Sequence, residues 1–258
     1  MVSGRPTAVW GFDGTLGHRR QGTWAECLLE VLDRQHPGHP FSQPQLFTAL
    51  RSGFPWHDHH RPHPHLNTAD RWWNHVTNVI SSALRGLGLQ AGTAAAVAHH
   101  TRDVYTDPAA WSLYPQAIAV LELLTSHGWD HILLTNHVPE LPGLLDHLQL
   151  SGHLHAVINS ADTGFEKPHP KAFASALAAS AGCRYMVGDN HRADITGAQS
   201  AGLDAIWVRR NQPDDVPDLH TAVRLILGTE HRTETAAPRT WEVAPLHSEQ
   251  TTPTAPFS

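Results

Sequence analysis

The sequence predicts an α/β fold in which a parallel β-sheet is interrupted after its first strand by an all-helical insert. Short apolar runs alternate with helix-patterned segments over residues 113–229, as expected for parallel strands joined by helical crossovers. One further apolar run opens the chain and stops at Asp13-Gly14-Thr15, and no convincing strand pattern lies between residues 17 and 112. The predicted core therefore comprises residues 1–16 and 113–229.

The insert, residues 17–112, is predicted to consist of helices. Thr23 is a suitable N-cap for the first helix, which the break at residues 37–40 ends. A short second helix follows, and then a loop over residues 53–64. Apolar residues recur at helical spacing in the first three helices, namely Trp24, Cys27, Leu28, Val31 and Leu32, then Leu46, Phe47 and Leu50, then Trp72, Trp73, Val76, Val79, Ile80, Leu84 and Leu87. An alanine-rich helix from about Thr93 to Val104 completes the insert.

The second half of the chain is predicted to supply the remaining strands and the helices between them. The apolar runs interpreted as strands are 132–136, 156–160, 185–187 and 205–208. The helical patterns are 115–128, closed by a glycine, then 141–150, 170–181 and 195–201. Residues 230–258 contain threonine and proline without sustained periodicity, so we predict a disordered tail there.

Composition limits the classes of partner. The formal net charge of −6 offers no basic surface for a nucleic-acid backbone. No apolar run approaches the roughly 20 residues that a membrane span requires. The two cysteines, Cys27 and Cys183, are too few for a disulfide framework, which favours a cytoplasmic location. We therefore expect neither nucleic acid nor membrane as the main partner.

The carboxyl ends of the predicted strands carry most of the candidate functional groups. In a parallel sheet these ends share one edge, and ligands bind just beyond it. Three carboxylates there suit a hard cation such as Mg²⁺, while a hydroxyl, an amide and an ammonium group suit phosphate oxygens. The predicted metal ligands are Asp13, Asp189 and Asp194, and the predicted phosphate-binding residues are Thr135, Asn136 and Lys167.

Each of these residues also has an ordinary structural explanation when taken alone. Lys167 is then a solvated surface lysine, Thr135 a helix cap and Asp189 a turn residue. The functional interpretation rests on their joint occurrence, because they follow successive strands in one order along the chain.

A histidine-rich segment is a competing candidate site. It places His57, His59, His60, His63 and His65 within a few residues of one another. Imidazole is a common ligand of zinc, copper and nickel, so a transition-metal site is one interpretation. The segment is broken by prolines and lacks the i, i+4 spacing of a helical site, which favours a solvated or substrate-facing loop.

The ordered motifs resemble those of the haloacid dehalogenase (HAD) superfamily of phosphatases and related hydrolases. The matching segments are Gly11-Phe12-Asp13-Gly14-Thr15-Leu16, Leu134-Thr135-Asn136, Lys167-Pro168-His169-Pro170 and Gly188-Asp189-Asn190-His191-Arg192-Ala193-Asp194. The resemblance implies a Rossmann-like core, a C1-type cap formed by residues 17–112 and bound Mg²⁺. It also implies hydrolysis of small phosphorylated or halogenated molecules, with Asp13 as general acid/base and Thr135 and Lys167 as catalytic residues.

One position departs from the family pattern. The first motif of the family begins with an aspartate that attacks the substrate and ligates the metal, and this sequence has Gly11 there. Glycine cannot form an aspartyl-phosphate, and its presence weakens the Mg²⁺ site by one carboxylate. Three interpretations follow: a hydrolase in which Asp13 activates water directly, a non-catalytic protein that binds phosphorylated ligands, or a recent or erroneous change in an otherwise ordinary enzyme.

Overall fold

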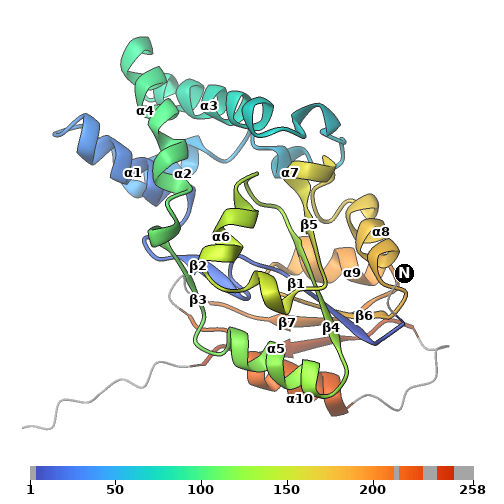
Figure 1. Ribbon diagram of the computed structural model, residues 1–258. Helices are drawn as coiled ribbons and strands as arrows, with labels where there is room; N and C mark the ends of the chain where they lie inside the picture. The colour runs from blue at the N-terminus through green and yellow to red at the C-terminus, as the bar shows by residue number, and fades with distance from the viewer. Residues whose placement is uncertain (1–3, 212–214, 229–236, 247–258) are drawn as a thin grey trace, which may run out of the picture.

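The computed structural model describes residues 4–211, 215–228 and 237–246, and these form an α/β fold around a parallel sheet (Figure 1). The strand order is β5-β4-β1-β6-β7-β8, and every neighbouring pair is parallel. The strands are β1 Thr7–Trp10, β4 Asp130–Thr135, β5 Ala156–Asn159, β6 Cys183–Gly188, β7 Asp204–Val208 and β8 Thr240–Val243. The predicted fold class is thereby confirmed.

Strand β1 lies inside the sheet and is completely buried. Val9 is in register with Ile132 of β4 on one side and with Met186 of β6 on the other. All four residues of β1 are buried, which explains why the strand reads as a continuous apolar run and not as an alternating one. The end of β1 is therefore held between the ends of its two neighbours.

Helices cover both faces of the sheet. On one face, α5 (Ala117–Ser126) packs against α10 (Leu219–Gly228), and both belong to the apolar cluster that contains Trp10. On the other face, α8 (Pro170–Ala179) and α9 (Gly197–Ser200) pack with Val9. The six-stranded sheet and the helices that cover it are called the sheet half below. Its shorter elements are α6 Leu141–His147, α7 Ser160–Thr163, a 3-10 turn at Ser151–His153 and a π-helical turn at His191–Thr196.

The first four helices of the chain form a separate layer, which lies away from α5 and α10 (Figure 1). They are α1 Trp24–Gln35, α2 Gln43–Ala49, α3 Ala69–Gly86 and α4 Ala91–Tyr105, with 3-10 turns at Pro55–Asp58, Pro64–Leu66 and Pro108–Ala110. The amide N–H of Thr23 donates to Glu26 Oε2 at 3.1 Å, which completes the start of α1. Glu140 joins this layer to the sheet half, because its carboxylate accepts hydrogen bonds from Trp73 Nε1 and from the Arg102 guanidinium group.

The prediction that residues 17–112 are entirely helical is wrong at both ends of the insert. Strand β2 (Gly17–Arg19) pairs antiparallel with β3 (Trp111–Leu113) and closes the base of the helical layer. Each strand has only three residues, so neither shows a recognisable alternation in the sequence. The pair brings the two connections of the insert together beside the end of β1.

The predicted disorder of residues 230–258 is also wrong in part. Strand β8 (Thr240–Val243) extends the sheet beside β7, and Trp241 packs near Tyr185 with ring centroids 6.0 Å apart. The rest of the predicted tail, apart from residues 237–246, lies outside the described residues.

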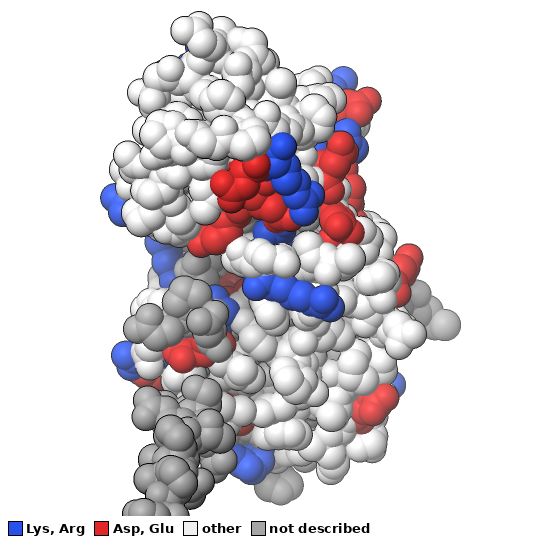
Figure 2. Space-filling view, turned by 90° about the vertical axis from the view of Figure 1, so that its left-hand side faces the viewer, with Lys and Arg blue, Asp and Glu red and all other residues white. Residues whose placement is uncertain are grey.

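Two surface features complete the description. In the described part of the chain, no helix has the length and apolar character that crossing a bilayer demands. Figure 2 shows acidic and basic side chains mixed across the middle of one face, with mostly uncharged surface above and below them. Among the described residues on that face, acidic and basic side chains thus lie next to one another.

Candidate active site

The end of β1 turns sharply through residues 11–17. The Phe12 carbonyl accepts hydrogen bonds from the backbone N–H groups of Thr15, Leu16 and Gly17, at 3.0 Å each. Gly14 has φ 74°, and a Cβ atom there would overlap Asp189 Oδ2. Glycine is therefore required at this position both by the backbone angle and by the close approach of Asp189.

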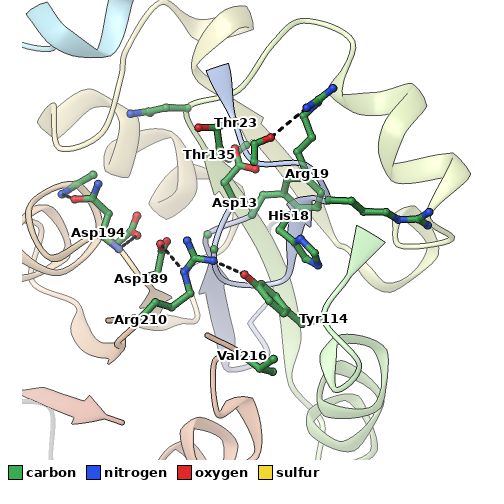
Figure 3. A pocket seen from close by; sticks show the side chains of 18 of the residues that line it. Asp13, His18, Arg19, Thr23, Tyr114, Thr135, Asp189, Asp194, Arg210 and Val216 are labelled. Atoms are coloured by element: carbon green, nitrogen blue, oxygen red, sulfur yellow. Dashed lines mark hydrogen bonds and ion pairs between the residues drawn. The ribbon is translucent and has the colours of Figure 1, made fainter. Parts of the chain in front are cut away.

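The predicted site residues converge on one cavity of about 930 Å³ at the carboxyl edge of the sheet. It is lined by Gly11 and Asp13 after β1, Thr135 and Asn136 at the end of β4, Asp189 and Asp194 after β6, and Lys167 from the loop between α7 and α8. Figure 3 shows Asp13, Thr135, Asp189 and Asp194 around this cavity. The parallel topology thus brings together side chains that are up to 181 positions apart, from Asp13 to Asp194.

Lys167 and Asp194 form a buried ion pair at the floor of the cavity. Lys167 Nζ lies 2.5 Å from Asp194 Oδ1, and both side chains are less than a tenth exposed. The amide N–H of Asn190 donates to the other oxygen, Asp194 Oδ2, at 3.0 Å. A Cβ atom at position 188 would overlap the same oxygen, so Gly188 gives Asp194 the room to approach.

Asn136 positions Lys167. Its Oδ1 accepts a hydrogen bond from the Lys167 N–H at 2.7 Å, and its Nδ2 donates to the Lys167 carbonyl at 3.0 Å. The sequence predicted Asn136 as a direct phosphate ligand. In the structure Asn136 lines the cavity, and its side chain fixes the backbone that carries the Lys167 ammonium group, so direct phosphate binding by Asn136 stays a prediction.

Asp13 combines burial with access to the cavity. Its Oδ1 is buried without a hydrogen-bond partner, although 35% of the side chain is exposed. Burial, together with the negative charge of Asp189, raises the pKa of Asp13 from 3.8 to about 7. Burial and the charge of Asp194 likewise raise the pKa of Asp189 to about 6. Close to neutral pH, Asp13 is therefore able to exist with or without its proton.

His137 stands beside Asp13 and was not predicted from the sequence. Its Nε2 lies 3.7 Å from Asp13 Oδ2, and neither ring nitrogen has a hydrogen-bond partner. Phe12 and Trp111 enclose the ring, with centroids 5.4 and 4.9 Å away. Burial lowers the pKa of His137 to about 3, so the imidazole is neutral. Its place directly after Asn136 was the available sequence signal, but Trp111 comes from a strand that the sequence did not reveal.

Arg210 is a second residue that the sequence reasoning missed. It follows the end of β7 by two positions, and it lines the cavity between Asp189 and Tyr114 (Figure 3). Arg210 Nε lies 3.7 Å from Asp189 Oδ2, and Nη1 donates to the Tyr114 hydroxyl at 2.5 Å. The sequence signal for Arg210 is its place just after a strand, because residues that follow the carboxyl ends of parallel strands line the same edge of the sheet.

Gly11 lies where the first motif enters the cavity. Its N–H donates to the Val187 carbonyl at 2.9 Å, which continues the pairing of β1 with β6. A Cβ atom at this position would lie 3.0 Å from Thr15 Oγ1 and 3.7 Å from Asp194 Oδ2. The 3.0 Å approach is tight, so a Cβ atom at position 11 requires the buried Thr15 hydroxyl group to shift by a few tenths of an ångström.

The predicted Mg²⁺ ligands do not assemble into a metal site. Within residues 4–211, 215–228 and 237–246, no three or more His, Cys, Asp or Glu side chains are grouped so that they could hold a metal ion. Gly11 supplies no ligand atom, and both oxygens of Asp194 already have partners. The donor set that the sequence suggested, Asp13, Asp189 and Asp194, therefore does not fit a bound divalent cation.

The histidine-rich loop likewise forms no metal site among the residues that the structure describes. Its histidines contact different partners. His63 Nδ1 lies 2.9 Å from Glu166 Oε2, Arg192 Nη2 donates to His59 Nε2, and His57 packs edge-on against Phe54. Among the described residues these histidines therefore do not form a group of metal ligands, and His59 and His63 connect the helical layer to the sheet half.

Comparison with solved structures finds the same fold in other proteins. The HAD-hydrolase YfnB from Bacillus subtilis, solved bound to magnesium, has a TM-score of 0.63 and 21% identity, covering 88% of this chain and 100% of that chain. At this level of identity the likeness concerns the fold alone.

Two curated relatives have closer sequences. The phosphoserine phosphatase of Thermus thermophilus is 38% identical over 117 residues, which is 42% of this chain and 47% of the relative. The ribulose-1,5-bisphosphate 5-phosphatase of Halopiger xanaduensis is 33% identical over 111 residues, or 42% and 46% of the two chains. The chain thus spans about half the length of the curated relatives it matches.

A family model covers most of the chain and includes every motif described above. The model of haloacid dehalogenase-like hydrolases matches residues 6–202, from the start of β1 to the end of α9 and beyond. The cavity residues Gly11 to Asp194 all lie within this match. The chain therefore belongs to the haloacid dehalogenase-like hydrolase family.

Proposed function

We propose that this chain binds small phosphorylated molecules at a phosphatase-type site on the carboxyl edge of its sheet. The observation that carries the proposal is the convergence of the Lys167 ammonium group, the Thr135 hydroxyl group and Asp13 on one cavity. A compact ammonium charge and a hydroxyl donor suit phosphate oxygens. The two curated relatives support this choice, because both are named as phosphatases of small phosphorylated molecules.

We further propose that Gly11 removes the covalent route of catalysis. A glycine cannot attack phosphorus, and no aspartyl-phosphate forms at that position. An aspartate at position 11 would need the Thr15 hydroxyl oxygen, 3.0 Å from an added Cβ atom, to shift slightly, and the nearest neighbours of that Cβ atom are all side-chain atoms. In this proposal the chain keeps the groups that hold the phosphate and lacks the group that attacks it.

The helical layer is proposed to act as a C1-type cap over the site. A second cavity of about 390 Å³ is lined by Trp24, Trp56 and Tyr105 from this layer and by Asp13 and Lys167 from the sheet half. Side chains of the layer would thus contact the part of the ligand that extends from its phosphate group. This arrangement assigns phosphate binding to the sheet edge and ligand selection to the helices.

A direct comparison of wild type with Gly11→Asp tests the proposal. With an aryl phosphate as substrate, measured with and without MgCl₂, we expect Gly11→Asp to exceed wild-type turnover by about 1,000-fold or more, because nucleophile loss has effects of at least this size in hydrolases. Gly11→Asn is the matched control, since it has the same size without a nucleophilic carboxylate. Equal and substantial turnover in all three proteins would contradict the proposal.

One observation favours a second candidate function, direct hydrolysis by water. Asp13 has a pKa of about 7 and faces the cavity, so its ionised form could accept a proton from water near neutral pH. This route predicts slow wild-type turnover that rises with pH through about 7 and is lost in Asp13→Asn. If no variant turns over and phosphorylated metabolites raise the melting temperature, the chain is a non-catalytic phospho-ligand-binding protein.

A further inference from the structure

We infer that the cavity binds phosphate without a divalent cation, with the Arg210 guanidinium group and the Lys167 ammonium group supplying the positive charge. This inference rests on the proposed function, because it concerns how the same site holds a phosphate group. Hydrolases of this family typically use Mg²⁺. The arrangement of charged groups in this chain differs from that expectation at three places.

The first difference is at Asp194. Its Oδ1 lies 2.5 Å from Lys167 Nζ, and its Oδ2 accepts the Asn190 N–H at 3.0 Å. The residue is only 2% exposed. Breaking a buried ion pair by withdrawing one partner is strongly unfavourable, so this carboxylate is committed to the lysine and to the backbone.

The second difference is at Asp189. Its Oδ1 accepts a hydrogen bond from the Thr15 hydroxyl at 3.4 Å, and its Oδ2 faces Arg210 Nε at 3.7 Å. The backbone at Gly14 also approaches this carboxylate closely, because a Cβ atom added at Gly14 would overlap Asp189 Oδ2. The cation that faces Asp189 in this structure is therefore a guanidinium group supplied by the chain itself.

The third difference is the way in which Arg210 is held. The Tyr114 hydroxyl accepts a hydrogen bond from Arg210 Nη1 at 2.5 Å, and His18 stacks on the Tyr114 ring at a centroid distance of 4.7 Å. The Tyr114 N–H in turn donates to the Leu16 carbonyl at 3.0 Å. A planar guanidinium group fixed at the cavity wall presents a geometry suited to phosphate oxygens.

These contacts give two of the carboxylates that line the cavity, Asp194 and Asp189, a cation from the chain itself. The Asp194 carboxylate pairs with Lys167 and the Asp189 carboxylate faces Arg210, while Gly11 adds no negative charge. A bound phosphate would then receive hydrogen bonds from the two cations and from Thr135, which lines the same cavity. In this arrangement a carboxylate ligand of a metal ion would have to displace one of the two existing cations.

Calorimetric titration of the wild-type protein tests the inference. We expect inorganic phosphate to bind with the same Kd, within about twofold, in EDTA and in MgCl₂, and MgCl₂ alone to give no saturable heat. Phosphate binding that appears only with MgCl₂ would overturn the inference and leave the proposed function intact. No phosphate binding under either condition would overturn both.

Variants of Arg210 give an independent readout. Arg210→Met should weaken phosphate binding by about tenfold or more, as expected for loss of a charge-assisted hydrogen bond. Arg209→Met is the matched control, because Arg209 pairs at 2.6 Å with Glu242 on the surface and should leave the Kd unchanged. Tyr114→Phe removes only the hydroxyl that holds Arg210 and should weaken binding by about fivefold. Equal Kd values for wild type, Arg210→Met and Tyr114→Phe, with circular dichroism showing that each is folded, would overturn the role of Arg210.

Discussion

Two regions of this chain gather functional side chains in opposite ways. The cavity at the sheet edge collects Asp13, Thr135, Lys167, Asp189 and Asp194, which are scattered over most of the sequence. The loop at residues 57–65 holds five histidines within nine positions, yet the described residues form no group that could bind a metal. Proximity in the sequence thus did not produce a site, and separation did not prevent one.

The difference follows from the backbone that carries each set. Parallel strands end at one edge, so residues just past those ends point into a common space whatever their separation along the chain. The loop has two short 3-10 turns and several prolines, and its histidine rings approach one another only in pairs, His59 with His60 at 3.9 Å and His63 with His65 at 6.0 Å between centroids. His59 and His63 instead contact Arg192 and Glu166 of the sheet half.

The largest expected effect is on turnover in the Gly11→Asp variant, where a change in the cavity is compared with a change in the loop. In Gly11→Asp, the further change Lys167→Met should reduce aryl phosphate turnover by about 100- to 1,000-fold, because it removes a positive charge from a preorganised site. The further change His60→Ala, in the loop, should leave turnover within about twofold. Similar losses from both changes would show that the loop shares the chemistry and would contradict the distinction drawn here.

A second expected effect concerns how the loop contributes to stability. His63→Ala leaves Glu166, which is 1% exposed, without its partner at 2.9 Å. The expected cost is about 2 kcal/mol in the free energy of unfolding, measured by urea denaturation at pH 7. His65→Ala is the control from the same loop and should cost less than about 0.5 kcal/mol. Equal costs for the two changes would show that the His63–Glu166 contact has no special role.

The pH dependence of stability probes the cavity itself. Because the folded protein raises the pKa of Asp13 from 3.8 to about 7, it binds this proton more tightly than the unfolded chain does. The resulting stabilisation is fully present below about pH 3.8 and is lost as the pH rises through about 7. Asp13→Asn should therefore raise the melting temperature relative to wild type by about 2–4 °C at pH 8 and much less at pH 5.

The opposite pH trend, with Asp13→Asn less stable than wild type at pH 8, would mean that the Asp13 carboxylate is stabilised by a partner. His137→Ala at the same two pH values gives the reciprocal case. Burial lowers the pKa of His137 from 6.5 to about 3, so below about pH 6.5 the unfolded chain binds a proton that the folded protein does not. Relative to wild type, His137→Ala should therefore be more stable at pH 5 than at pH 8, which is opposite to the trend of Asp13→Asn.

The smallest expected effect is the absence of zinc binding by the loop. Titration of wild-type protein with zinc should give no saturable heat, because the loop histidines contact separate partners. A saturable one-to-one heat that disappears in His59→Ala and His63→Ala would contradict this interpretation.

The sequence was informative wherever a strand was long enough to show its pattern. Strand β1 reads as an apolar run that is soon followed by Asp13. Strand β4 ends at Thr135, and β6 is followed directly by Asp189, so the edge of the sheet could be predicted. Thr23 similarly marked the start of α1 correctly. The apolar runs and the N-cap depend on residues that are neighbours in the sequence, and the tertiary contacts of the folded chain favour the same elements.

The sequence was uninformative where structure depends on partners far along the chain. Strands β2 and β3 have three residues each and lie more than 90 positions apart, so no local pattern reveals their pairing. Strand β8 has four residues and is stabilised by β7 from across a long connection. The position of His137 beside Asp13 depends on Trp111 of β3, and it could not be inferred without that strand.

The most direct test of the central claim is a crystal structure of the wild-type protein with inorganic phosphate. The account predicts one phosphate ion within hydrogen-bonding distance of Lys167 Nζ and the Thr135 hydroxyl group, with Asp13 facing it and open space at Gly11. A phosphate ion bound at the histidine-rich loop, with the cavity at the sheet edge free of phosphate, would contradict the account.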